Sequence, residues 1–184
     1  ATAVLCTATQ PVLGDLIQRF APSHAVSEIC PEIPFYFDKF RRVTFQQLDV
    51  LEDDALAELL CTHEQVLCIV NSRKAAQSIF LKLPGEGSFH LSTLMVPKHR
   101  RAVLEEIRRR LNDGLPCRVV STSLIEAGVD ADFPAVYREL AGLDSILQAA
   151  GRCNREGKHA AEDSIVTIFR RTEKAPPLFG QAIG

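Results

Sequence analysis

Short apolar runs alternate with helical stripes of apolar residues along most of this 184-residue chain. The plainest run is VLCIV at residues 66–70, and a continuous run of this kind is typical of a parallel strand buried on both faces. Further strands are expected at residues 3–6, 42–45, 89–93, 117–120, 135–138 and 164–169, and helices at 11–20, 53–60, 73–83, 97–111 and 143–150. This alternation predicts an α/β fold, with a parallel sheet flanked by helices and right-handed crossovers.

Composition narrows the classes of function that are open to the chain. Hydrophobic residues make up 46% and charged residues 24%, and no apolar stretch reaches the roughly 18 residues of a membrane span. We therefore expect a soluble, cytoplasmic protein with no membrane partner. The net charge of −2 provides no overall attraction for nucleic acid, so any contact with DNA must be local. The cysteines and histidines fall at no metal-ligand spacing, which predicts no metal site.

Two arginines stand three residues apart in the segment QAAGRCNR at residues 148–155. If Asp144 or Ser145 caps the preceding helix, a turn at Gly151 would project Arg152 and Arg155 from the end of that helix toward one spot. A guanidinium matches phosphate oxygens bidentately, so such a pair can stabilise the charge on a transferring phosphoryl group. The alternative is a surface helix that ends in ordinary solvated arginines.

Hydroxyl side chains gather where the strand at residues 117–120 ends, at Ser121 and Thr122. Ligands of open α/β sheets bind at such strand ends. Further on, Gly128 permits a turn that other residues resist, and Asp130 follows as an acceptor on a loop. The alternatives are a local cap for the hydroxyls and a plain turn carboxylate for Asp130.

Residues 121–130 (STSLIEAGVD) and 141–155 (AGLDSILQAAGRCNR) together resemble motifs V and VI of superfamily 2 helicases, the second with the pattern Gln-x-x-Gly-Arg-x-x-Arg. The sequences of these two segments are similar to those of the CRISPR-associated helicase-nuclease of type I systems. The resemblance implies a RecA-like fold in which this chain supplies the second of two helicase lobes.

The resemblance also implies roles for these residues. Arg152 and Arg155 would reach ATP that the first lobe holds, and Gln148 would couple that site to the DNA path. Gly128 and Asp130 would help to close on the nucleotide.

Two shorter stretches resemble other helicase motifs. Asn71 follows a strand as in motif IV, which implies that Asn71, Ser121 and Thr122 touch DNA phosphates; the alternative is a helix cap by Asn71 or Ser72. The basic face of the helix at 97–111 either contacts phosphates or is only solvated, as such faces usually are. The N-terminal stretch resembles motif III, which couples nucleotide state to lobe closure, through Thr7, Ala8 and Thr9.

The resemblance divides the chain into a remnant of the first lobe at residues 1–10, a linker region at 11–40, the second RecA-like domain at 41–172 and a tail at 173–184. Because the chain starts at Ala1, and Met95 is its only methionine, we expect it to be a piece of a longer protein.

No Gly-x4-Gly-Lys-Ser/Thr phosphate loop occurs in the sequence. ATP and Mg²⁺ would therefore be held mainly by the missing lobe, and the chain alone should be inactive. The implied partners are single-stranded DNA, the first lobe and a CRISPR RNA-guided surveillance complex. The alternatives are the same lobe of another superfamily 2 DNA helicase, such as a branch-migration enzyme, or a non-catalytic nucleic-acid-binding module.

Overall fold

The computed structural model describes Arg19, residues 32–123 and residues 131–172. Contacts divide the chain into two compact units, residues 1–41 and 42–184. In the first unit a short helix, α2 (Ile33–Lys39), lies in the region expected to be a linker, with Pro34 in its first turn. Proline is tolerated there because the first helical N–H groups have no partner within the helix. This proline therefore starts a helix instead of only marking a linker.

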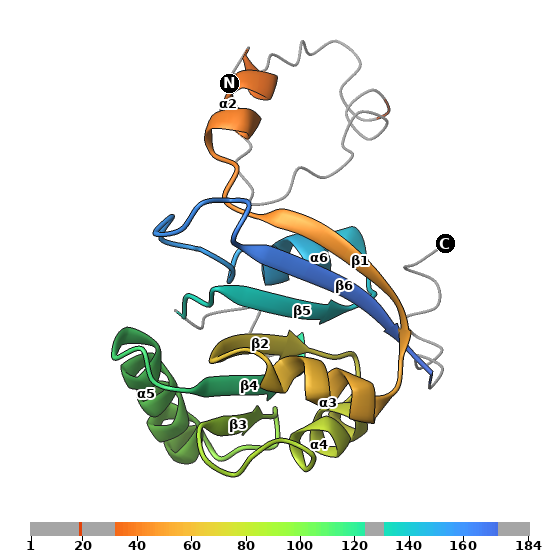
Figure 1. The fold of residues 1–184 in the computed structure, drawn as a ribbon, viewed down its shortest axis with the longest axis vertical. Helices are drawn as coiled ribbons and strands as arrows, with labels where there is room; N and C mark the ends of the chain where they lie inside the picture. The colour runs from red at the N-terminus through yellow and green to blue at the C-terminus, as the bar shows by residue number, and fades with distance from the viewer. Residues whose placement is uncertain (1–18, 20–31, 124–130, 173–184) are drawn as a thin grey trace. The chain divides into compact units, whose positions relative to one another are not determined.

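The second unit is built on a six-stranded sheet with the strand order β1-β6-β5-β2-β4-β3, in which every pair is parallel. The predicted RecA-like α/β architecture is confirmed (Figure 1). The strands are β1 (Thr44–Leu51), β2 (Gln65–Ile69), β3 (Ser88–Leu91), β4 (Cys117–Ser121), β5 (Ala135–Glu139) and β6 (Ile165–Arg171). The helices are α3 (Asp53–Cys61), α4 (Arg73–Phe80), α5 (Pro97–Asn112) and α6 (Leu143–Ala150).

Each face of the sheet is covered by its own pair of helices. Val66 of β2 belongs to a core that includes Ile79 of α4 and the buried residues of α3. Its neighbour Leu67 belongs to the opposite core, with Ile107 of α5 and Ala149 of α6. Successive strand residues point to opposite faces, so both faces of the strand are apolar, as the run at 66–70 predicted. Within the described ranges, no helix is long and apolar enough to cross a membrane.

The edge strand β1 begins later and runs further than the predicted strand at 42–45. Its pairing with β6 is irregular between Gln47 and Val50, and Phe45 and Val50 are about half exposed, at 47% and 53%. A strand with only one neighbour tolerates polar and exposed positions. For this reason β1 lacks the continuous apolar pattern that revealed the inner strands.

One helix start differs from the sequence expectation. Helix α6 begins directly after Gly142, so Asp144 and Ser145 lie in its first turn and neither is its cap; that prediction was wrong. Helix α3 follows Glu52 and begins at Asp53, as expected, with the carboxylate of Asp53 in its first turn. A carboxylate in the first turn still interacts favourably with the helix dipole.

Because all strands are parallel, the sheet has a carboxyl end, where the strands finish, and an amino end, where they start. Ser121 closes β4 at the carboxyl end, beside Ile69 of β2. Helix α6 leaves the carboxyl end after β5 and leads to the amino end, where Cys153 pairs with Phe133 just before β5. The predicted site residues that the structure describes are thereby sorted into groups at the two ends of the sheet.

Candidate functional site

At the carboxyl end, the hydroxyl groups after β4 are buried. Ser121 is fully buried, and its hydroxyl donates to the Thr122 carbonyl over 2.9 Å. The Ser121 carbonyl accepts a hydrogen bond from the Val70 N–H at 2.9 Å. Thr122 is 8% exposed. In this conformation the surface offered to a ligand at this point is therefore small.

Asn71 is held between β2 and β5 by three hydrogen bonds. Its N–H donates to the Glu139 carboxylate at 2.7 Å, and its side-chain amide donates to the Leu140 carbonyl at 2.9 Å. Its side-chain oxygen accepts from the Arg138 guanidinium at 2.7 Å. The cap of α4 is Ser72, whose hydroxyl accepts from the Ala75 N–H at 3.1 Å. Asn71 thus binds β5, and Ser72 supplies the cap.

Sequence reasoning missed Arg138 and Glu139, which lie at the end of β5 and are 2% and 6% exposed. The Arg138 guanidinium also donates to the Glu139 carbonyl at 2.7 Å. Burial raises the pKa of Glu139 above its ordinary value, while the Asn71 N–H and the charges of Arg171 and Arg138 act in the opposite direction. The sequence signal that could have revealed them is a charged pair at the end of an otherwise apolar strand.

A partly buried ion pair lies beside this group and explains the place of Asp53. The Asp53 carboxylate accepts from the Arg171 guanidinium at 2.6 and 2.9 Å, and from the Ser78 hydroxyl at 2.6 Å. The two charged side chains are 19% and 5% exposed. Asp53 thereby joins α3 to β6 and α4, which is a tertiary role that a helix-start pattern cannot reveal.

At the amino end, the loop after α6 is fastened to the segment before β5. The Phe133 N–H donates to the Arg152 carbonyl at 2.9 Å, and the Asn154 N–H donates to the Phe133 carbonyl at 3.0 Å. Between them Cys153 is 1% exposed, and burial raises the pKa of its thiol to about 12. Cys153 is therefore a core residue, protonated at neutral pH.

Asn154 shapes this loop, and sequence reasoning gave it no role. It adopts a left-handed backbone, with φ of 46°, which asparagine tolerates better than most residues. Its side-chain amide donates to the carbonyls of Arg42 and His159 at 2.9 and 2.8 Å, and its side-chain oxygen accepts from the His159 N–H at 3.1 Å. One buried side chain thus closes the loop and ties it to the start of the second unit.

Asp132 fixes the backbone at the second arginine of the doublet. Its carboxylate accepts from the N–H groups of Arg155 and Glu156 at 2.6 and 3.3 Å. The Arg155 side chain is exposed, whereas Arg152 is only 8% exposed. The two arginines therefore differ in environment, and Arg155 is the one presented to solvent.

Gln148, the third predicted residue of this segment, is exposed on α6.

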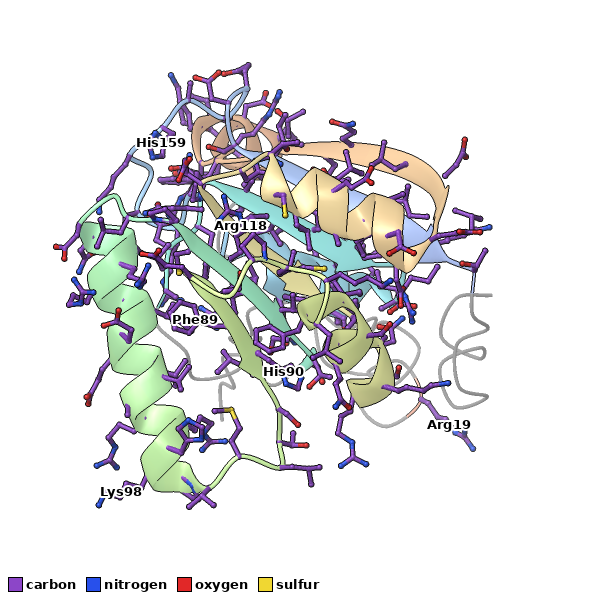
Figure 2. The ribbon with its side chains drawn as sticks, turned by 60° about the horizontal axis from the view of Figure 1, so that its bottom comes forward. Arg19, Phe89, His90, Lys98, Arg118 and His159 are labelled. Atoms are coloured by element: carbon purple, nitrogen blue, oxygen red, sulfur yellow. The ribbon has the colours of Figure 1, made fainter. Side chains whose placement is uncertain are left out.

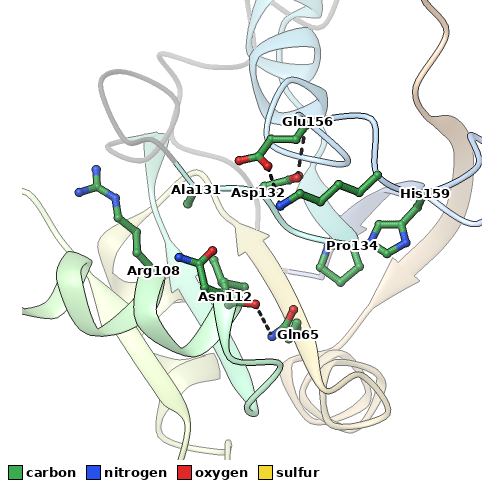
Figure 3. A pocket seen from close by; sticks show the side chains of 10 residues that line it. Gln65, Arg108, Asn112, Ala131, Asp132, Pro134, Glu156 and His159 are labelled. Atoms are coloured by element: carbon green, nitrogen blue, oxygen red, sulfur yellow. Dashed lines mark hydrogen bonds and ion pairs between the residues drawn. The ribbon is translucent and has the colours of Figure 1, made fainter.

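A pocket of about 550 Å³ lies beside this loop (Figure 3). Asp132, Glu156 and Lys158 line one side, and the C-terminal half of α5 contributes Arg108 and Asn112. Lys158 pairs with Glu156 at 2.6 Å. The lining carries charges of both signs. Among the residues that the structure describes, no cluster of three His, Cys, Asp or Glu side chains could hold a metal ion.

Five predicted site residues lie outside the described part of the chain: Thr7, Ala8, Thr9, Gly128 and Asp130. Their roles stay predictions.

A known protein family matches the central part of this chain. Residues 62–158, which include both groups of side chains, match the family model described as CRISPR-associated nuclease/helicase Cas3, C-terminal. A protein named CRISPR-associated nuclease/helicase Cas3 from Haloferax volcanii is 39% identical over 83 residues, which are 44% of this chain and 9% of the relative. The chain therefore spans a small part of the length of this relative.

Solved structures share the fold. The crystal structure of T. fusca Cas3 superposes with a TM-score of 0.59 at 18% identity, covering 76% of this chain and 19% of that one. The structure of Mycobacterium smegmatis helicase Lhr bound to ssDNA and AMP-PNP gives 0.53 at 17% identity, covering 70% and 20%. At such identities the likeness establishes the fold alone, so the family assignment comes from the sequence match.

Proposed function

Because the chain belongs to the family of the CRISPR-associated nuclease/helicase Cas3 C-terminal domain, we propose that it is the second RecA-like lobe of an ATP-dependent single-stranded DNA translocase that acts in CRISPR interference. The observation that carries this proposal is the placement of Arg155. Its side chain is exposed while Asp132 and Asn154 fix the backbone around it. A guanidinium presented from a fixed backbone is what a finger arginine requires.

In this proposal the amino end of the sheet acts on the nucleotide. Arg155, with Arg152, stabilises charge on the transferring phosphoryl group of ATP, and Gly128 and Asp130 help to close on it. The first lobe of the parent protein supplies the phosphate loop and the ligands of Mg²⁺, because this sequence contains no such loop. The chain alone then binds neither cofactor and hydrolyses no ATP.

The carboxyl end would contact DNA. Asn71, Ser121 and Thr122 stand at adjacent strand ends, and the proposal assigns them to phosphates of a single strand. The helicase Lhr shares this fold, and its solved structure is bound to ssDNA, which supports a nucleic-acid contact by this lobe. Gln148 on α6 lies in the element that joins the two ends of the sheet, and Thr7, Ala8 and Thr9 would couple lobe closure to nucleotide state. A CRISPR RNA-guided surveillance complex would deliver the DNA.

The test is the replacement of Arg155 by alanine in the full-length protein. A finger arginine is worth about 10³ to 10⁵ in turnover, so DNA-stimulated ATP hydrolysis should fall by that order while nucleotide affinity changes little. Arg155→Lys should fail as well, because an ammonium group lacks the planar fork.

The matched control is Arg170→Ala, which removes an exposed arginine near the opposite end of the sheet. It should leave turnover near the wild-type value. Near-normal hydrolysis by both Arg155 variants, or a loss of folding in Arg155→Ala as judged by circular dichroism, would show that the residue is structural.

A further inference from the structure

The basic side chains of α5 fall into two zones with different partners. In the C-terminal half, Arg109 contacts Glu106 at 2.7 Å and Asp113 at 3.0 Å, and Arg110 contacts Glu106 at 2.9 Å. These two guanidinium groups lower the pKa of the Glu106 carboxyl to about 2. Their positive charge is therefore largely compensated within the helix.

The N-terminal half lacks this compensation. Lys98 and Arg101 are exposed, and neither side chain has an ion pair or hydrogen bond with any described residue. Residues three apart on a helix lie on the same face, so the two charges act together. Glu105 is one turn beyond Arg101, yet the two form no ion pair. No acidic residue occurs in the first turn of α5.

This half of α5 stands at the carboxyl end of the sheet. Leu91, the last residue of β3, is the register partner of Ser121, and only five residues separate it from Pro97. That connection is ordered by Ser92, whose hydroxyl accepts from the Leu94 N–H at 3.3 Å and whose carbonyl accepts from the Met95 N–H at 3.1 Å. Figure 2 shows Lys98 at one end of α5 and His159 beyond the other.

We propose that Lys98 and Arg101 form a binding site for phosphates of single-stranded nucleic acid, which extends the DNA-binding surface from the end of β4 past β3 onto α5. This inference rests on the proposed function, since it adds a stretch of path to the same strand. Ammonium and guanidinium groups without a carboxylate partner can release counterions from a phosphate backbone when they bind it. The exposed Leu94 and Val96, at 75% and 66%, precede the two cations in the chain and offer apolar contact to sugars and bases.

The experiment compares charge removal in the two zones of the same helix, using the 184-residue chain and a fluorescent oligothymidylate. Anisotropy titrations over a series of salt concentrations give the slope of log affinity against log salt for the wild type, Lys98→Ala/Arg101→Ala, Arg101→Ala and Arg109→Ala. Each lost phosphate contact should reduce the magnitude of the slope by about 0.7, so the double variant should lose about 1.4. Arg109→Ala should leave the slope unchanged.

The other outcomes would contradict the inference, and they show whether the proposed function fails with it. If Arg101→Ala and Arg109→Ala lower the slope equally, only bulk charge matters, and the inference fails while the proposed function stands. The same conclusion follows if the double variant binds like the wild type and Asn71→Ala binds more weakly. No oligonucleotide binding by the wild type would overturn both proposals. Alanine favours helix, so far-UV circular dichroism should confirm that all variants keep α5.

Discussion

The two ends of the sheet are organised by different physical means. At the carboxyl end, buried charged side chains bind one another and the backbone across β2, β5 and β6, as Arg138 and Asp53 do. At the amino end, Asp132 and Asn154 hold a loop by its own N–H and carbonyl groups. The first arrangement joins elements of the core, whereas the second shapes one segment. Damage to the first should therefore reduce the stability of the whole unit, and damage to the second should mainly disturb the loop.

The largest effect should come from Arg138→Met, which removes the buried guanidinium but keeps much of its volume. The Asn71 side-chain oxygen would then remain buried without its cationic donor, and the buried Glu139 carboxylate would lose one of the two arginine charges near it. Removing one partner from a buried charged group costs about 3 to 5 kcal/mol. We expect the free energy of unfolding, measured with urea, to fall by about that amount.

Arg170→Met is the matched control, because this arginine lies on β6 and is exposed. Its effect should stay within about 0.5 kcal/mol. Equal losses in the two variants would mean that the network at the carboxyl end adds nothing to stability, and the contrast between the two ends would collapse.

A smaller loss should follow from Asn154→Ala. Three side-chain hydrogen bonds disappear, and alanine is strained at a φ of 46°. Leaving buried groups without partners costs about 1 to 3 kcal/mol, so the loss of stability should lie below that of Arg138→Met. In the full-length protein, ATP turnover should fall steeply, because the backbone that carries Arg155 loses its support.

Asn154→Gly separates the two causes. Glycine adopts positive φ without strain but makes none of the side-chain hydrogen bonds. If turnover recovers in the glycine variant, backbone conformation is what matters; if it stays low, the hydrogen bonds are the cause. Full turnover in both variants would refute the claim that Asn154 positions Arg155.

The sequence predicted what depends on local pattern. The inner strands were predicted because both faces are apolar, and the arginine doublet and Asn71 were chosen as candidates because they follow a helix and a strand. The contacts that hold them were not predictable in this way. Asp132 and Arg155 are 23 residues apart, and their hydrogen bond depends on the bridge between Phe133 and Cys153. Asn71 meets Arg138 only because β2 and β5 are neighbours in the sheet.

The smallest expected effect is a difference in pH dependence between the two ends. At the amino end of β2, burial and the nearby Arg118 charge lower the pKa of His63 below 6.5. The unfolded chain then takes up a proton more readily than the folded one, so this contribution to stability is lost as pH falls below 6.5. At the carboxyl end, the pKa of Glu139 is raised above 4.5, so its contribution is present in acid and is lost as pH rises.

The two contributions act in opposite directions between about pH 4.5 and 6.5, and His63→Gln should separate them. Glutamine does not titrate and can still bond to the Tyr137 hydroxyl, which lies 3.0 Å from the histidine ring. On acidification across this range, the urea midpoint of His63→Gln should shift upward relative to that of the wild type, because the remaining Glu139 contribution increases stability in acid. Identical pH profiles would mean that His63 titrates alike in the folded and unfolded chain, and the expected asymmetry between the two ends would then lack an electrostatic component at β2.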